Sequence, residues 1–196
     1  MAAVMLFGVN PAHAQLSGNY TIGPTGNYTT INDAAGALNS QGVSGPVTFT
    51  IQAGTYTDAV LLNSITGVSA TNTVTFDGVD PATRKLEVNT TSTTSYCIRF
   101  NGADYVTFKN LSIEATGATY GYGVHFTNNS DYNTIQDCKI EVSTTSTNSY
   151  CIAILASGSN YYYSSGQSGS YLTIKDNEIK GGYYGIRMNG TSSSTQ

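Results

Sequence analysis

The sequence predicts an all-β protein made of stacked coils of short strands, with one short helix before them. The main reason is a nine-residue phrase that occurs three times, as YVTFKNLSI from Tyr105, YNTIQDCKI from Tyr132 and YLTIKDNEI from Tyr171. Because residue type recurs position by position, like residues are expected to stack on like in successive coils. The 196 residues are rich in polar turn and strand formers, contain no Trp and suit a single domain.

The spacing of the copies sets the size of a coil. The first two copies start 27 residues apart, at Tyr105 and Tyr132, which is too short for a strand, a helix and their loops. The third starts 39 residues after the second, and the extra length matches the stretch NYYYSSGQSGS from Asn160. A loop inserted into one coil is therefore expected at this stretch.

A second repeated segment precedes the phrase, as YCIRF from Tyr96, YGVHF from Tyr122, YCIAI from Tyr150 and YGIRM from Tyr184. Alternation with a period of two places one set of apolar side chains inward: Ile98, Phe100, Val124, Phe126, Ile152, Ile154, Ile186 and Met188. The same alignment puts Cys97 and Cys151 in one column. It also creates an outward column of Arg99, His125, Ala153 and Arg187.

In the nine-residue phrase, alternation sends Val106 and Phe108 inward and Tyr105, Thr107 and Lys109 outward. The second copy places Asn133 inward, where its amide needs hydrogen-bond partners. The turn that follows is expected to use left-handed backbone at Asn110, Asp137 and Asp176, since Asn and Asp tolerate that region.

Charge and cysteine content exclude several classes of protein. The net charge is −4 and Lys and Arg do not cluster, so nucleic-acid binding is not expected. Cys97 and Cys151, two coils apart in one column, would have Cα atoms ~9.6 Å apart, too far for a disulfide. Cys138 is expected to be a small buried side chain, and no metal site is expected because no His or carboxylate is suitably spaced.

The N-terminal region divides into three parts. Residues 1–14 resemble the end of a secretory signal peptide, with Ala12 and Ala14 before a cleavage point, so the protein is expected to be secreted or displayed at the cell surface, without a membrane span. Residues 15–46 include a capping helix at about 30–41, which starts with a capping box at Thr30 and Asp33 and ends at Gly42. Residues 47–196 form the coils, which we expect to be truncated at the C-terminus.

The chain also resembles a known superfamily. YTTINDAAGALN followed by VTFTIQAGTYTDAV is similar to the capping helix, first strand and turn that open the pectin-lyase-like proteins, and YVTFKNLSI resembles one of their coils. The resemblance spans about residues 20–190 and implies a right-handed parallel β-helix. The Thr-rich style is also similar to that of large secreted surface proteins of Bacteroidota-type bacteria.

The chemistry of that superfamily supplies weak catalytic candidates. Its lyases hold Ca²⁺ on clustered carboxylates, and its hydrolases pair aspartates. Asp137 and Asp176 share a column here, and His125 lies in the column of Arg99. A structural role for the acids and a solvated surface for the histidine are the simpler interpretations. No cofactor is expected in general. Ca²⁺ would be expected only if the protein is a lyase.

The residues most suited to ligand binding are aromatic or carry hydroxyls. One predicted strip joins a tyrosine column to a threonine column: Tyr105, Tyr132, Tyr171, Thr107, Thr134 and Thr173. The inserted loop adds Tyr161, Tyr162 and Tyr163. Sugar rings can stack on aromatic faces, although such ladders also stabilise neighbouring strands without any ligand.

These observations favour a secreted β-helix with a structural, adhesive or carbohydrate-binding role, whose partner is a polysaccharide or another cell surface. One alternative is the N-terminal part of a polysaccharide lyase or glycoside hydrolase. Another is a self-assembling solenoid that stacks end to end through an open C-terminal coil.

Overall fold

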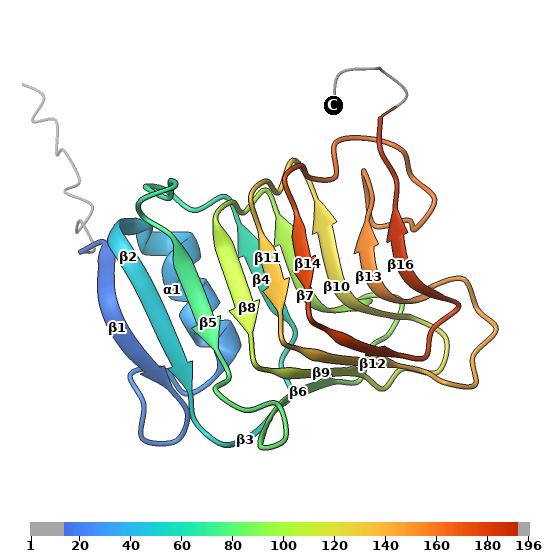
Figure 1. Ribbon diagram of the computed structural model, residues 1–196, viewed down its shortest axis with the longest axis horizontal. Helices are drawn as coiled ribbons and strands as arrows, with labels where there is room; N and C mark the ends of the chain where they lie inside the picture. The colour runs from blue at the N-terminus through green and yellow to red at the C-terminus, as the bar shows by residue number, and fades with distance from the viewer. Residues whose placement is uncertain (1–13, 192–196) are drawn as a thin grey trace, which may run out of the picture.

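The chain winds into a stack of coils, and each full coil gives one strand to each of three parallel sheets (Figure 1). The computed structural model describes residues 14–191. Sheet A contains, in spatial order, β1 (Leu16–Ile22), β2 (Val43–Ile51), β5 (Val74–Asp77), β8 (Val106–Lys109), β11 (Thr134–Gln136) and β14 (Thr173–Lys175). Every strand pairs in parallel with its neighbours.

The other two sheets follow the same order along the stack. Sheet B contains β3 (Gly54–Tyr56), β6 (Arg84–Val88), β9 (Ser112–Ala115), β12 (Lys139–Val142) and β15 (Glu178–Lys180). Sheet C contains β4 (Val60–Asn63), β7 (Tyr96–Asn101), β10 (Gly121–Thr127), β13 (Cys151–Ala156) and β16 (Tyr184–Met188). The expected parallel β-helix with one short helix is therefore confirmed.

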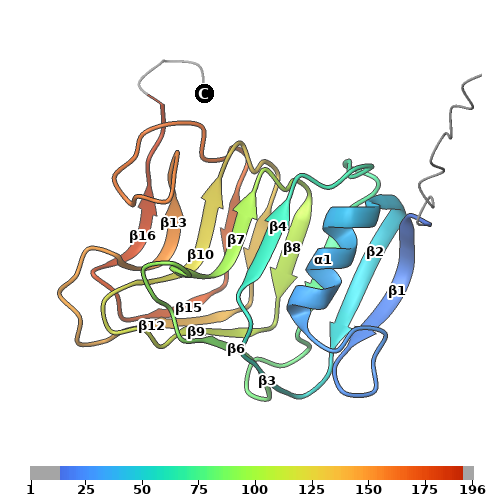
Figure 2. The same cartoon turned by 180° about the vertical axis from the view of Figure 1, so that it is seen from behind.

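The helix α1 (Ile31–Gln41) covers the N-terminal end of the stack, beside β4 (Figure 2). Thr30 and Asp33 form the expected capping box, and Gly42 ends the helix. Its apolar side buries Ile31, Ala34, Ala35 and Leu38. The side chain of Asn39 donates to the carbonyl of Leu61 and accepts from the N–H of Asn63, so the helix also occupies the open edge of β4.

The strand β1 was not anticipated. It precedes the helix and pairs with β2, so sheet A has one more strand than sheet B or sheet C. Its pattern is weak, because only Leu16 and Ile22 of its seven residues are buried. The strand β2 also begins at Val43 and so crosses the expected boundary between residues 46 and 47.

The interior is built from columns of like apolar residues. Phe49, Phe76 and Phe108 stack in sheet A with ring centroids 4.8 and 4.5 Å apart. Phe100 and Phe126 stack in sheet C at 4.6 Å. Such pairs add to the stabilisation from burial.

Asn133 lies in this interior and is fully buried, as expected. Its oxygen accepts from the N–H of Val106 at 2.9 Å, and its NH₂ donates to the carbonyl of Ala103 at 2.7 Å. Both partners belong to the preceding coil, so this polar side chain joins two coils.

The expected register of β13 is wrong by two residues. Ile152, not Tyr150, lies beside Tyr122, so Leu155 rather than Ala153 continues the column of Arg99 and His125. Ile154 and Ala156 point into the core, whereas Ile152 packs outside it. The reason is the length of the preceding turn, since residues 143–150 join β12 to β13 whereas only residues 116–120 join β9 to β10. At the corner, Gly123 lies level with Ala153, and a Cβ at Gly123 would lie 2.6 Å from the carbonyl oxygen of Ala153.

The three cysteines are free and buried, as expected. The argument from one shared column fails for Cys151, because Cys151 is level with Gly121 while Cys97 is level with Gly123. The two thiols are offset along the strand as well as along the stack. Burial raises the pKa of Cys97 well above its ordinary value and that of Cys138 to about 11, so neither thiol is a reactive thiolate.

The two ends of the described stack differ. At the C-terminal end, Ile186 and Met188 are 47% and 48% exposed, although they lie in register with core residues of β13. Within residues 14–191 no helix has the length and apolar character needed to cross a membrane. Most of the expected signal peptide, residues 1–13, lies outside the described residues.

Candidate functional site

The predicted tyrosine column exists, but its geometry differs from a flat sugar-binding strip. The rings of Tyr105, Tyr132 and Tyr171 are parallel within 1° and 3°, with centroids 4.8 and 4.5 Å apart. They stack on one another, so both faces of Tyr132 are covered. Only ring edges and hydroxyls face the solvent along the column, and Tyr171, 71% exposed, is its outermost ring. Stacking of a sugar on an aromatic face of this column is therefore limited to its ends, of which Tyr171 is the more exposed.

The threonine column next to it is longer than expected. Thr48 and Thr75 extend the predicted row of Thr107, Thr134 and Thr173 to five consecutive strands of sheet A. On its other side runs a mixed row that includes Asp77, Lys109 and Gln136. The face is regular, and none of its five threonines lines the pockets at the outer face of sheet C, beside α1 or at the C-terminal end of the stack; Tyr171 lines the last of these.

The acidic turn residues are structural. Asn110, Asp137 and Asp176 have φ of 55°, 52° and 55°, as the turn prediction requires. Asp137 accepts from the side chain of Gln136, and Asp176 lies 3.5 Å from Lys175 Nζ. No group of three or more His, Cys, Asp or Glu within residues 14–191 is placed to hold a metal. The donor set that the resemblance implies for Ca²⁺ does not fit these residues.

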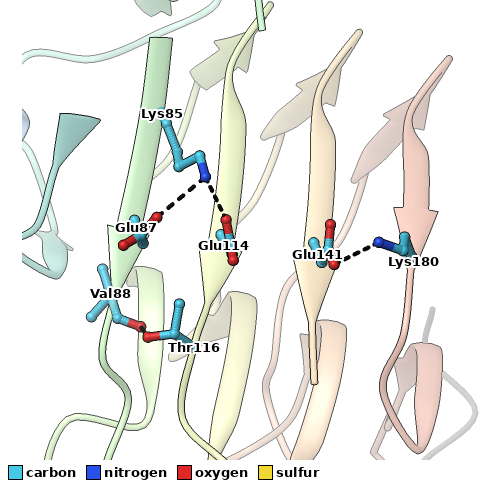
Figure 3. A network of polar contacts seen from close by, with 7 residues as sticks. All are labelled: Lys85, Glu87, Val88, Glu114, Thr116, Glu141 and Lys180. Carbon is cyan, nitrogen blue, oxygen red and sulfur yellow. Dashed lines mark hydrogen bonds and ion pairs between the residues drawn. The ribbon is translucent and has the colours of Figure 1, made fainter. Parts of the chain in front are cut away.

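Sheet B carries most of the remaining charge, and its charges neutralise one another (Figure 3). Lys85 Nζ lies 2.7 Å from Glu114 and 3.2 Å from Glu87, and Lys180 lies 2.7 Å from Glu141. Each of these side chains is at least a quarter exposed, so each pair stabilises the fold by less than about 1 kcal/mol. Arg84, at the start of β6, has no carboxylate partner in the described part of the chain and donates instead to the carbonyl of Ile51 and the hydroxyl of Thr83.

The outer face of sheet C is different, because the inserted loop covers it. Tyr122, Ile152 and Leu155 are fully buried there, outside the main core. Tyr162 of the loop packs on this cluster, in contact with Tyr150 at 4.9 Å. Tyr161 and Tyr163 stay 55% and 57% exposed. The loop therefore folds back on the coil instead of protruding from it.

A groove of about 330 Å³ lies between this loop and the turns before β7, β10 and β13. Its lining combines aromatic rings, hydroxyls, one amide and one guanidinium: Tyr120, Tyr122, Tyr150, Tyr161, Ser92, Thr93, Ser95, Asn160 and Arg99. Of the predicted ligand-binding residues, only Tyr161 lines it.

Arg99 is the charged residue of the groove. Its guanidinium lies 3.9 Å from the ring centroid of Tyr96, and its Nε–H donates to His125 Nδ1 at 3.1 Å. Its contact with Ser95 Oγ is long, at 3.4 Å. Burial lowers the pKa of Arg99, but guanidinium stays charged in proteins. This half-buried cation therefore keeps donors available for an anion.

Within residues 14–191 the lysines and the arginines differ in whether they have a carboxylate partner. All five lysines lie within 4 Å of a carboxylate. The arginines form no such pair in the described part of the chain; Arg187, on the same face as Arg99, contacts the rings of Tyr162 and Tyr184. Two of the three arginines, Arg99 and Arg187, thus place positive charge without a carboxylate partner on the outer face of sheet C.

His125 is fully buried under the loop, which corrects its expected place on a solvated surface. Burial, and then the charge of Arg99, lower its pKa to about 3. Because Nδ1 accepts from Arg99, the ring proton of neutral His125 is on Nε2, which donates to Ser157 Oγ at 2.8 Å. Ser157 donates in turn to the carbonyl of Ser159. His125 therefore has no free lone pair with which to activate Ser157 as a nucleophile.

No known protein family, curated protein or solved structure matches the chain. The site therefore has to be judged from its own residues. The sequence did bring Arg99 and His125 into one column, and this is confirmed. The groove itself was missed, because its walls come from turns and from a loop whose fold-back leaves no periodic pattern in the sequence.

Proposed function

We propose that the protein is an extracellular β-helix that binds an acid-bearing saccharide in the groove around Arg99. The observation that supports this most is a half-buried guanidinium without a carboxylate partner, in a groove lined by four tyrosines. Guanidinium pairs with carboxylate or sulfate through two parallel hydrogen bonds. Tyrosine offers apolar surface to sugar C–H groups, and the hydroxyls of Ser92 and Thr93 can pair with sugar hydroxyls.

A glycan array of acidic and neutral oligosaccharides tests this proposal. Wild type is expected to retain acidic glycans. Arg99→Gln should lose about tenfold or more in affinity, as expected for a charge-assisted pair, and Tyr161→Ala should weaken binding through lost aromatic contact.

Two variants control for the other tyrosine surfaces. Tyr183 is as exposed as Tyr161 but does not line the groove, so Tyr183→Ala should bind normally. Tyr132→Ala should also bind normally. Loss of binding in Tyr132→Ala together with full binding in Arg99→Gln would move the site to sheet A and reject the proposal.

A lyase or hydrolase activity has less support. No carboxylate lines the groove, and His125 has no free lone pair with which to take a proton. An assay for unsaturated products on uronate polymers tests this alternative, and product formation would establish it.

The exposed C-terminal end favours a second candidate function, which is the association of two copies. Two copies would meet through the coil of β16, where Ile186 and Met188 are exposed although they lie in register with core residues of β13. Sedimentation velocity should then show a concentration-dependent dimer that Met188→Lys abolishes. A monomer at all concentrations would reject it.

A further inference from the structure

We propose that acid opens the groove, because protonation of His125 releases residues 157–164, the part of the loop that forms one of its walls. The consequence for ligand binding rests on the proposed function. The movement of the loop does not, and it can be measured in the absence of ligand.

His125 lies at the point where the loop leaves the coil. Ser157 follows β13 directly and is bonded to His125 Nε2 at 2.8 Å. Ser157 Oγ then donates to the carbonyl of Ser159 at 2.8 Å, which shapes the first turn of the loop. The next two residues, Asn160 and Tyr161, line the groove. The histidine thus connects the sheet to the groove wall through one serine.

Residues 167–170 of the loop are bonded to residues 129–132 of the preceding coil and stay in place. The wall formed by residues 157–164 has fewer attachments. The N–H of Ser157 donates to the carbonyl of Phe126, and the side chain of Asn189 donates to the carbonyl of Tyr162. The hydroxyl of Tyr122 donates to the carbonyl of Asn160 at 3.3 Å. Tyr162 packs on Tyr150 and lies over Arg187. These contacts hold the loop closed when His125 is neutral, but none of them compensates a charge on His125.

The surroundings of His125 disfavour its protonated form. On β7, the guanidinium of Arg99 lies 3.1 Å from Nδ1. On its own strand the neighbour is the ring of Tyr122, at 5.3 Å between centroids, and on β13 it is Leu155. The loop contributes only Ser157 and Ser159. In the described part of the chain no carboxylate is bonded to the ring, so a proton on Nδ1 would break the bond from Arg99 and set two cations side by side. The bond from Nε2 to Ser157 would remain, so the loop opens because the buried charge is unfavourable and not because that bond is lost.

The direction of the pH effect follows from linkage. With the loop closed, burial and Arg99 keep the pKa of His125 at about 3. With the loop open, water reaches the ring, and its pKa returns toward the ordinary value of about 6.5. The open form then binds the proton more tightly. Each pH unit below about 6.5 shifts the equilibrium about tenfold toward the open form, down to a pH of about 3, and above 6.5 the closed form keeps its full advantage.

Hydrogen exchange of the loop amides measures the opening without any ligand. The N–H groups of Gly158 and Ser164 are bonded within the loop, so their protection reports whether it is folded. After correction for the intrinsic pH dependence of exchange, protection in wild type should fall about tenfold per pH unit as the pH drops from 6 to 4. Amides in the interior of sheet A should show no such change.

His125→Gln is the matched variant, because a glutamine amide can accept from Arg99 and donate to Ser157 but does not titrate. Its loop protection should not depend on pH. Equal pH responses in the two proteins, or none in wild type, would overturn the proposal. Should the variant not fold, an NMR titration of His125 in wild type decides. A midpoint well below 6.5 supports opening of the loop by acid, and a midpoint near 6.5 overturns it.

Glycan affinity at pH 7 and pH 5 then separates the two proposals. Affinity should fall at pH 5 in wild type and not in His125→Gln. If acid opens the loop but no glycan binds at any pH, the proposed function is rejected and the opening of the loop by acid is supported. If glycan binds but the protection of the loop amides does not change with pH, only the opening of the loop by acid is rejected.

Discussion

Left-handed backbone at single residues shapes each coil. Tyr105, Tyr132 and Tyr171 have φ of 56°, 57° and 54°, a region that few residues other than glycine adopt. The alternation rule placed them outward as ordinary strand residues, although the strands begin one or two positions later. Stacking of the three rings on one another offsets this strain, so the main role of the tyrosine column is to stabilise the coils.

Val79 provides a test of such strain. Its φ is 63° and its side chain is 53% exposed. A β-branched residue therefore adopts left-handed backbone here, and burial of its side chain offsets little of the strain. Replacement by Asn, which tolerates this region, should raise the free energy of unfolding by about 1 kcal/mol. Val79→Ala, which removes only the branching, should gain less. Urea denaturation checks the order, and an Asn variant no more stable than wild type would contradict it.

The buried amide of Asn133 allows a second test. Asn133→Ala leaves the N–H of Val106 and the carbonyl of Ala103 without partners, which should cost about 2–3 kcal/mol. Asn177 makes the equivalent pair of bonds to Cys138 and Ile135 but is only half-buried. Water can replace its amide, so Asn177→Ala should cost less than about 1 kcal/mol. Similar losses for both variants would refute this explanation.

Among the elements, α1 depends on its first turn. Thr30 accepts from the N–H of Asp33, and Asp33 accepts from the N–H of Thr30. Thr30→Ala should lower the free energy of unfolding by about 1 kcal/mol, measured by thermal or urea unfolding. The neighbouring Thr29 is exposed and outside the capping box, so Thr29→Ala should change stability by less than about 0.5 kcal/mol. Equal effects would show that the cap does not matter.

The elements also show how far a single sequence can be interpreted. The repeats predicted β8, β11 and β14 of sheet A, and the capping box predicted the helix, because burial and capping leave strong local patterns. The predicted register of β13 was wrong, since matching Tyr150 to Tyr122 by residue type ignored the longer turn between β12 and β13. The groove around Arg99 could not be found at all, because it depends on which way a polar loop folds.

At the scale of the whole molecule, charge is distributed unevenly. The lysines have carboxylate partners at the surface, whereas Arg99 and Arg187 stack on tyrosines of the outer face of sheet C. A protein of net charge −4 thus presents one face suited to anions.

Salt should therefore affect binding more than stability. Raising NaCl from low to high concentration screens exposed ion pairs that stabilise the fold little, so the melting temperature should change by only a few degrees. The affinity for an acidic glycan should fall several-fold. Calorimetry of melting and of binding at the two salt concentrations checks both, and a salt-independent affinity would contradict an ionic contact.

The most direct measurement compares one acidic oligosaccharide with its carboxyl-reduced form by titration calorimetry, on wild type and on Arg99→Gln at pH 7. If Arg99 binds the acid group, wild type should prefer the acidic form about tenfold or more, and Arg99→Gln should bind both forms equally weakly. An acidic preference that survives in Arg99→Gln, or its absence in wild type, would contradict the account.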